Sequence, residues 1–411
     1  MSYRFVKITT FYRDFLRQYY QKNPEIVFRN YREQLTHLFE QYFGWSNFYE
    51  LHLRELGVDA FEIISNAEIL QNTWAKENGT TVAGKDIVVE QLKVLQPDVV
   101  MFQDSFIFNG EWINNLREKI PSIKLVIGFC CSPFKYEHLE QFKVFDFSFV
   151  CSPKFLEDFT VLGLKAYELH HAFESEILEK LNTDNFYPDT DLIFSGSIIT
   201  GYGFHEQRQR ILEELLKSKI DIKLLVNLPE INSLDLFIRR GGYVAAKILD
   251  KIGLRSFAEN NSRLRKSLLL PGMPTRPKNY AKLLKVIHPP VFGLEMLKVL
   301  SHSKIGFNSH GEIAGDYAAN VRLFEVTGAG SCLITDWKKN LDNFFEIDKE
   351  VVAYESTEEC IEKVQWLINH PKERKEIAKA GQKRTLRDHT FKQRAEQLNS
   401  IIQKELLIKK Y

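Results

Sequence analysis

The residues best suited to bind a phosphorylated ligand gather in the stretch 304–336. Asn308 and His310 follow a short apolar run that is typical of a buried parallel strand. After a polar loop, Asn320 can cap a helix that begins Val-Arg-Leu-Phe-Glu, and Gly328-Ala-Gly330 ends that helix before another apolar run. In an open α/β sheet, a loop at the carboxyl end of a strand, beside a helix amino terminus, is where anionic ligands bind.

Two charged residues of this helix suit the two parts of a nucleotide. Arg322, in the first turn, could contact a diphosphate through both arms of its guanidinium. Glu325, one turn further along, could accept hydrogen bonds from a vicinal diol such as a ribose. The alternative is an Arg322–Glu325 ion pair at i,i+3 on a surface helix without any ligand. The helix alone leaves both interpretations open.

The pattern Asn-x-Arg-Leu-Phe-Glu-x-Thr-Gly-x-Gly, followed by Leu-Ile-Thr-Asp, resembles the signature of the glycosyl transferases group 1 superfamily. The most similar branch contains spore-maturation-protein-like and lipopolysaccharide or capsule glycosyltransferases. The similarity runs from about Asp191 to the end of the chain. A weaker similarity covers the first hundred residues, in Lys7-Ile-Thr-Thr-Phe-Tyr12 and Trp74-Ala-Lys-Glu77. The resemblance implies that Glu325 holds the nucleotide ribose, and that nearby loop residues, Asn308, His310 and Asn320 among them, contact the donor.

One position departs from the family pattern. Retaining members of the superfamily carry two glutamates eight positions apart, but Tyr317 stands eight positions before Glu325. The contact to the donor sugar and the retaining or inverting outcome therefore stay open.

The elements that must position these residues follow a regular order. Short apolar runs alternate with helical segments, which is typical of parallel α/β winding, and 411 residues favour two domains. The resemblance implies the GT-B architecture, in which two Rossmann-like domains face each other across a cleft. We expect an acceptor-side domain at 1–185, a nucleotide-sugar domain at 191–388 with a basic insertion at about 230–285, and helix 389–411 crossing back to domain one.

Composition narrows the class of protein and its surroundings. The chain is 44% hydrophobic and 27% charged with a net charge of +1, as expected for a soluble globular protein that is not a polyanion binder as a whole. Five cysteines, without paired spacing beyond Cys130-Cys131, predict reduced thiols rather than a disulfide scaffold or a zinc site. Without a leader or an 18-residue apolar stretch, we expect a cytoplasmic protein, either free or peripheral at the inner face of the cell membrane.

Domain one should supply the acceptor side of the reaction. An aromatic-rich stretch at 14–55 is interpreted mainly as core, although some of its rings could line an acceptor cleft. If the enzyme inverts configuration, a general base should follow a strand of this domain. Asp104 is the first candidate, and His171 and His170 are weaker ones because either could be a satisfied core histidine.

The start of the second domain offers further donor contacts. Gly196 and Ser197 follow a predicted strand at residues 192–195, and the resemblance assigns this loop to the donor diphosphate together with Arg208 in the next helix. The alternative for Arg208 is an exposed helix arginine. Asp189-Thr-Asp191 has the form of a metal motif but precedes a strand, so it is interpreted as a linker. We expect no metal site and no cofactor, the nucleotide sugar being a substrate.

The segment 239–285 is strongly basic, with twelve Lys or Arg residues against Asp250 and Glu259. Tyr243 to Ile252 is amphipathic with cations on its polar side, so the segment could contact anionic lipid or hold a phosphorylated acceptor. The alternative is a solvated basic insertion. Nucleic acid is not expected, because no recognised binding module accompanies the charge.

The sequence therefore predicts a metal-independent glycosyltransferase that moves a sugar from a nucleotide sugar to a glycan, lipid-linked or other acceptor, in bacterial cell-surface polysaccharide synthesis. The arginines and a helix amino terminus would neutralise the departing nucleoside diphosphate. Two rivals stay open: an epimerase or phosphorylase on the same fold, and a non-catalytic protein that binds sugar nucleotides.

Overall fold

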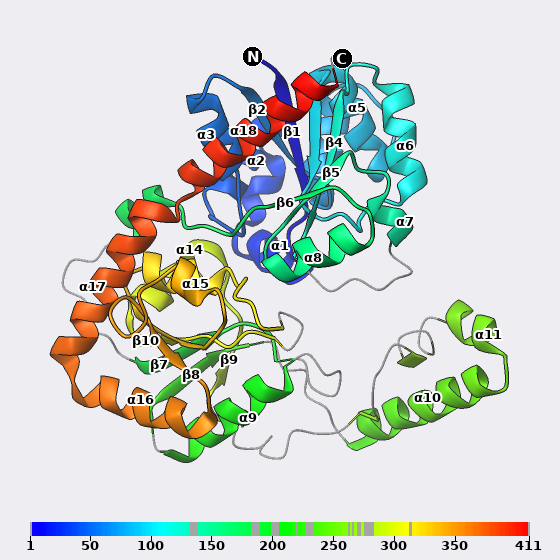
Figure 1. Ribbon diagram of the computed structural model, residues 1–411. Coiled ribbons are helices and arrows are strands. Elements are labelled where there is room, and N and C mark those ends of the chain that lie inside the picture. Colours follow the sequence, from blue (N-terminus) through cyan, green and yellow to red (C-terminus); the bar gives the residue numbers. More distant parts are fainter. Residues whose placement is uncertain are drawn as a thin grey trace.

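The protein folds into two α/β halves (Figure 1). The computed structural model describes residues 2–131, 139–181, 190–198, 205–218, 220–226, 233–261, 264, 267–268, 273–274, 283–311 and 315–409. Among these residues the strands form two sheets of six parallel strands each. The predicted α/β class with two Rossmann-like halves is confirmed.

The first sheet has the order β2-β1-β3-β4-β5-β6. Its strands are almost continuously apolar because helices cover both faces, as parallel sheets require. The strands are β1 (Arg4–Thr9), β2 (Asp59–Ile64), β3 (Val99–Phe102), β4 (Leu125–Cys130), β5 (Phe147–Val150) and β6 (Ala166–Glu168). The helices are α1 (Arg13–Lys22), α2 (Tyr31–Phe39), α3 (Phe48–Glu55), α4 (Glu68–Glu77), α5 (Lys85–Leu95), α6 (Gly110–Lys119), α7 (Leu139–Phe142) and α8 (Pro153–Val161).

The second sheet has the order β12-β11-β10-β7-β8-β9. Its strands are β7 (Thr190–Ser195), β8 (Ile222–Leu225), β9 (Ile287–His288), β10 (Ser303–Phe307), β11 (Cys332–Asp336) and β12 (Val352–Tyr354). The helices after β7 are α9 (Glu206–Leu215), α10 (Ser233–Lys251), α11 (Arg255–Asn260), α14 (Gly293–Ser301), α15 (Arg322–Gly328), α16 (Thr357–Asn369), α17 (Pro371–Asp388) and α18 (Phe391–Ile408). In the stretch 304–336, the two predicted strands are β10 and β11, and the predicted helix between them is α15.

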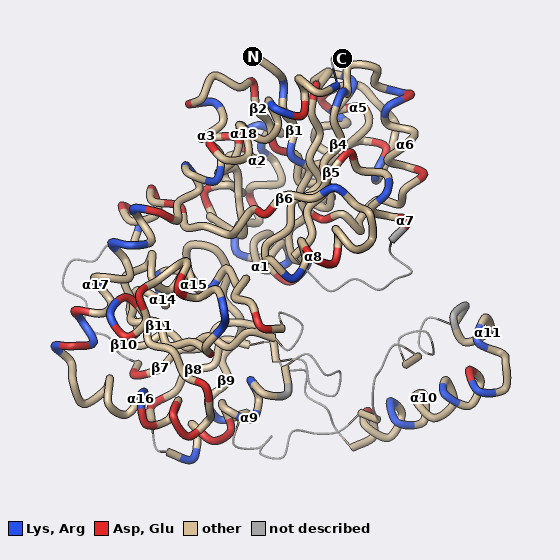
Figure 2. The backbone as a smooth tube through the Cα atoms, viewed as in Figure 1, with Lys and Arg blue, Asp and Glu red and all other residues tan. Residues whose placement is uncertain are grey.

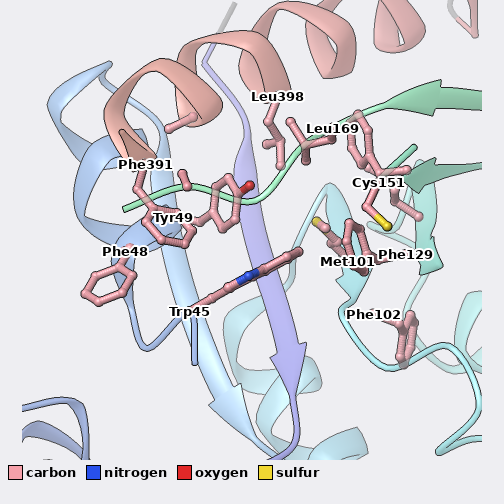
Figure 3. Close-up of a cluster of buried hydrophobic side chains, with 14 of the residues drawn as sticks. Trp45, Phe48, Tyr49, Met101, Phe102, Phe129, Cys151, Leu169, Phe391 and Leu398 are labelled. Atoms are coloured by element: carbon pink, nitrogen blue, oxygen red, sulfur yellow. The ribbon is translucent and has the colours of Figure 1, made fainter. Parts of the chain in front are cut away.

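The last helix returns to the first half, as predicted. Figure 1 shows α16 and α17 on the second half and α18 across the first. Phe391, at the start of α18, packs between Phe48 and Tyr49 of α3, with ring centroids 4.8 and 5.5 Å apart (Figure 3). Further along α18, Asn399 accepts a hydrogen bond from the hydroxyl of Tyr3 at 2.9 Å. The burial of these aromatic rings ties the end of the chain to the first half.

A second contact between the halves lies at the start of α14. The ring of Phe292 packs edge-on against Phe15 and Phe43 of the first half, at centroid distances of 6.0 and 5.7 Å. Lys22 of α1 forms an ion pair with Glu295 of α14 at 2.7 Å. The two halves are therefore also joined through α14.

Helices α10 and α11 stand apart from both sheets (Figure 1). They belong to the predicted basic insertion, most of whose remaining residues lie outside the described residues. Of the predicted linker Asp189-Thr-Asp191, Asp189 also lies outside them, whereas Thr190 and Asp191 begin strand β7, so the linker prediction is wrong for these two residues. Among the helices described, none is long and apolar enough to cross a membrane.

Candidate functional site

A cavity of about 750 Å³ lies between the carboxyl ends of the two sheets. This volume is typical of small-molecule sites, and the strand ends are where α/β folds bind ligands. The first half contributes Thr9, Thr10, Phe11, Tyr12, Arg13, Asp14, Tyr42, Phe43, Gly44, Trp45, Gln103, Phe129 and His171 to its wall. The second half contributes Ser195, Gly196, Ser197, Leu225, Pro290, Val291, Phe292, Gly293, Met296, Val321, Arg322 and Glu325.

Arg322 and Glu325 both lie in this wall, on α15. Arg322 Nη1 is 2.7 Å from Glu325 Oε2, so the i,i+3 ion pair considered from the sequence does form. The pair is not on an open surface, because its side chains are only 13% and 15% exposed. A guanidinium and a carboxylate at the wall of a cavity can exchange this mutual contact for a ligand's phosphate and hydroxyl groups.

Asn320 organises the loop before α15. Its side-chain oxygen accepts a hydrogen bond from the backbone N–H of Arg322 at 3.0 Å. Asn320 lies two residues before α15 begins, and the N-cap residue of the helix is Val321 rather than the predicted Asn320. Its side-chain nitrogen donates to Asn308 at 2.9 Å, and Asn308 donates to Thr335 at 2.9 Å. Asn308 is 1% exposed and does not line the cavity, so it fixes the loops rather than contacting the space directly.

His310 is held behind the cavity wall by Asp336. Its Nδ1 lies 2.7 Å from Asp336 Oδ1, and its backbone N–H donates to the same oxygen at 2.8 Å. Burial opposes ionisation of Asp336, but the charge and hydrogen bonds of His310, with Lys338 nearby, outweigh it and lower its pKa to about 2. His310 Nε2 is buried without a hydrogen-bond partner among the described residues. The histidine does not line the cavity.

Arg208 is buried rather than exposed on its helix, which excludes the alternative considered from the sequence. It donates to the carbonyl oxygens of Ser197, at 2.7 Å, and of Ser309. Arg208 therefore clamps together the loops after β7 and β10, and Gly196 and Ser197 of the first loop line the cavity. A Cβ at Gly196 would lie 2.9 Å from the ring of Phe194, so a larger residue would push this loop.

The catalytic candidates of the first half fall in different places. Asp104 does not line the cavity, although its neighbour Gln103 does. The carboxylate of Asp104 accepts hydrogen bonds from the Thr10 hydroxyl at 3.3 Å and from the Phe106 N–H at 3.1 Å. His170 also lies outside the wall, with Nδ1 3.2 Å from the carbonyl oxygen of Cys151.

His171 lines the cavity, but both of its nitrogens have neighbours. The indole N–H of Trp45 lies 3.2 Å from Nδ1, which must accept that bond, so the ring proton sits on Nε2 and faces Cys131 Sγ at 3.2 Å. Burial lowers the pKa of His171 to about 4, with the charges of His170 and Arg394 acting in the same direction. The imidazole is therefore neutral at pH 7.

The prediction that all cysteines are reduced is wrong for two of them. Cys131 and Cys151 form a disulfide at the ends of the adjacent strands β4 and β5. Since neighbouring parallel strands end side by side, residues 20 apart in sequence meet there. With His171 they also form a group of potential metal ligands within 4.8 Å. Because the sulfurs are bonded to each other and His171 presents a proton, this geometry favours the disulfide over a metal.

Gln103 lines the cavity, and its hydrogen bonds to buried residues of the first sheet were not predicted from the sequence. Its side-chain oxygen accepts hydrogen bonds from Lys7 Nζ at 3.1 Å and the Thr9 hydroxyl at 2.9 Å. Lys7 is fully buried and lies 3.2 Å from Glu62 on the adjacent strand. Burial raises the pKa of Glu62 to about 8 and lowers that of Lys7. The signal in the sequence was a charged residue within each of two apolar strands.

The aromatic stretch of the first half serves both purposes considered from the sequence. Phe15 stacks on Phe43 at 4.2 Å within the core. Tyr42, Phe43 and Trp45 also line the cavity, so these rings present flat apolar faces to whatever enters it.

A family described as glycosyl transferase-like matches residues 258–400. No curated protein matches the chain by sequence. In fold, the chain is similar to a glycosyltransferase from Rickettsia africae, with 10% identity, a TM-score of 0.52 and 99% of each chain covered. It is also similar to Anabaena HepE in complex with UDP and glucose, with 8% identity, a TM-score of 0.54, and coverage of 98% of this chain and 100% of that one.

The same fold likeness extends to sucrose-phosphate synthase from Thermosynechococcus elongatus, with 9% identity, a TM-score of 0.51 and 98% of each chain covered. Residues 258–400 thus match a glycosyl transferase-like family, and the fold of the whole chain is the GT-B fold of these solved glycosyltransferases. The resemblance stated from the sequence signature is thus confirmed at the level of the superfamily. The narrower branch stays a prediction.

Proposed function

We propose that the protein transfers a sugar from a nucleotide sugar to an acceptor, with both substrates meeting in the cavity between the halves. The observation that carries this proposal is the composition of the cavity wall. The second half contributes the charged pair Arg322 and Glu325, and the first contributes aromatic rings and the amide of Gln103. One side thus suits a nucleoside diphosphate and the other a sugar or apolar acceptor.

On the donor side, Glu325 accepts hydrogen bonds from the ribose hydroxyls, and Arg322 turns from Glu325 to the diphosphate. The backbone at Gly196 and Ser197, in the same half of the cavity wall, contacts the phosphates. Arg208, Asn308, His310 and Asn320 act as positioning residues, because their contacts hold the loops that carry these groups. The occurrence of UDP in the similar Anabaena protein supports testing uridine nucleotides first.

The chemical step separates a nucleoside diphosphate from an oxocarbenium-like sugar. Arg322 stabilises the negative charge that develops on the leaving group, so we propose that no metal is required. If the reaction inverts configuration, Asp104 or His171 removes the acceptor proton. Asp104 would need to reach the cavity past Thr10. His171 would need to release Trp45, because its accepting nitrogen is Nδ1.

We further propose a glycan or lipid-linked acceptor, with a role in cell-surface polysaccharide synthesis and a cytoplasmic location at the inner face of the membrane. The basic segment 239–285 supports this placement, since its excess of cations suits an anionic surface.

A thermal-shift screen with nucleoside diphosphates and nucleotide sugars tests the donor site. We expect one nucleotide to raise the melting temperature of the wild type and of Glu346→Ala, an exposed acid of the same half, but not of Glu325→Ala. An equal shift in Glu325→Ala would remove Glu325 from the site. Incubation of the labelled donor without acceptor then separates the rivals, because an epimerase changes the sugar and a non-catalytic protein leaves the donor intact.

A further inference from the structure

Helix α10 exposes a row of large apolar side chains. Phe237 is 75% exposed, Ile248 is 54% exposed, and Leu234, Ile238 and Val244 are also exposed. Ile252, just after the helix, is 60% exposed. Globular proteins rarely expose contiguous apolar surface of this extent unless it binds something.

The spacing places these residues on one face of the helix. At 3.6 residues per turn, one face of the helix carries the exposed apolar residues at positions 234, 237, 238, 244, 248 and 252. Gly241 and Ala245 lie on the same face. Over 19 residues the helix is about 28 Å long. The row is therefore a continuous apolar stripe along the whole helix.

Helix α11 covers a different side of α10. Ala246 of α10 and Ala258 of α11 are both fully buried, and the two helices are in contact. Phe257 of α11 is 63% exposed, and Leu254, the residue just before α11 begins, is 50% exposed. The pair of helices thus keeps its small residues inside and turns its large apolar residues outward, the reverse of a helix pair that packs onto a protein core.

Cations flank the stripe. Arg240, Lys247 and Lys251 follow one another along one flank of the helix, at three- to seven-residue intervals, and Figure 2 shows the basic residues along α10. Arg240 Nε and Lys247 Nζ donate to the carbonyl oxygens of Pro274 and Leu268, at 2.9 and 3.3 Å, which holds both side chains beside the helix. An apolar stripe with cations along its flank is the pattern of helices that lie in the interface of anionic membranes.

We propose that the apolar face of α10, extended by Leu254 and Phe257, inserts into the headgroup region of an anionic lipid bilayer while Arg240, Lys247 and Lys251 contact the lipid phosphates. The contact needs both parts: the apolar side chains leave water, and the cations bind the negative surface. Because α10 and α11 stand apart from both sheets (Figure 1) and contribute no residue to the cavity wall, the contact anchors the enzyme without occupying its substrate site. Its purpose, to bring the cavity to a membrane-borne acceptor, rests on the proposed function.

Co-sedimentation with vesicles tests this inference. We expect the wild type to bind phosphatidylcholine vesicles that contain phosphatidylglycerol and to bind pure phosphatidylcholine at least about tenfold more weakly. The double variant Phe237→Ser with Ile248→Ser should lose about tenfold or more in affinity, as removal of two inserted side chains requires. The matched control, Phe28→Ser with Val161→Ser, removes two side chains that are 89% and 86% exposed elsewhere and should bind as the wild type does.

The charge requirement is tested separately with Lys247→Glu and Lys251→Glu together. This variant should lose at least about twentyfold in affinity for the anionic vesicles at low salt, and the difference from wild type should shrink at high salt. All variants should keep the wild-type melting temperature, since neither α10 face packs on a domain core.

Three results would overturn the proposal. One is equal vesicle binding by the apolar variant and the wild type. Another is a wild-type dimer in solution that the apolar variant disrupts, without vesicle binding, which would make a second copy the occupant of the face. The third is binding of single-stranded RNA, and not of vesicles, that only the charge variant loses. A nucleotide-induced thermal shift measured on the same samples keeps the outcomes distinct, because vesicle binding without any shift would contradict the proposed function alone.

Discussion

The backbone N–H of Leu294 donates a hydrogen bond to the carbonyl oxygen of Gln41 at 2.8 Å, and so joins the two halves beside the cavity. The residue before Leu294 allows this contact. Gly293 has φ +56°, and a Cβ built there would lie 2.0 Å from the same carbonyl oxygen. Any other residue would be strained in its own backbone and would also push the first half away.

Gly293→Ala should therefore weaken the joint between the halves. We expect the free energy of unfolding to fall by about 2 kcal/mol or more. If the two halves separate without unfolding, we expect a larger radius of gyration. Urea unfolding and small-angle X-ray scattering measure the two effects. The control is Gly241→Ala in α10, where no atom lies within 4 Å of the added Cβ and stability should change by less than about 1 kcal/mol. An unaffected Gly293→Ala variant would show that the two halves are not held together here.

The Cys131–Cys151 disulfide closes a loop with a sequence separation of 20 residues. The entropy that this closure removes from the unfolded chain corresponds to about 3 kcal/mol of stability. Unfolding by urea with and without dithiothreitol should show that difference in the wild type and none in Cys131→Ser. Counting alkylated thiols under denaturing, non-reducing conditions checks the bond itself, with three reactive cysteines expected and five if the thiols are reduced.

The His310–Asp336 pair predicts a dependence of stability on pH. The folded-state pKa of Asp336, about 2, lies below its ordinary value of 3.8. The ionised carboxylate therefore contributes about 2 kcal/mol above pH 4, and this contribution is lost as the pH falls from about 4 to 2. Asp336→Asn should be less stable than the wild type at pH 7, and the gap should narrow at pH 3. A gap that stays constant with pH would exclude a charged pair.

Lys7 and Glu62 face each other in the register of β1 and β2, and both are fully buried. Lys7→Met or Glu62→Leu alone leaves a buried ionisable group without its partner, so each should cost about 3 kcal/mol or more, whereas the double variant should recover most of this loss. Arg4 and Asp59 are an exposed ion pair on the same strands, 2.6 Å apart, and removing either should cost less than about 1 kcal/mol. Additive losses at Lys7 and Glu62 would contradict the pairing.

The sequence predicted those parts of the site that depend on local order. The strand, loop and helix around Arg322 and Glu325 follow from one contiguous pattern, and both side chains reach the cavity. The helix begins one residue later than predicted, so its N-cap residue is Val321 rather than Asn320, although Asn320 still accepts a hydrogen bond from the N–H of Arg322. The return of α18 to the first half followed from the family resemblance, and the apolar face of Phe391 and Leu398 is what packs there.

The remaining contacts depend on which strands are neighbours, which a single sequence does not show. Asp336 meets His310 only because β11 lies beside β10, and Glu62 meets Lys7 only because β2 lies beside β1. The disulfide had a local signal, since Cys-Ser-Pro occurs twice, at Cys131 and at Cys151, each time after a predicted strand. The placement of Asp104 outside the cavity wall depends on its hydrogen bonds to Thr10 and Phe106, a local turn that strand patterns do not predict.

The central claim is that a nucleotide lies in the cavity with its ribose against Glu325 and its diphosphate near Arg322. A crystal structure of the protein with the nucleotide that gives the largest thermal shift tests it directly. The account predicts ribose hydroxyls within hydrogen-bond distance of the Glu325 carboxylate, with the Arg322 guanidinium turned from Glu325 to the phosphates. A nucleotide bound elsewhere, or one bound in the cavity while the 2.7 Å Arg322–Glu325 pair stays closed and touches neither ribose nor phosphate, would contradict it.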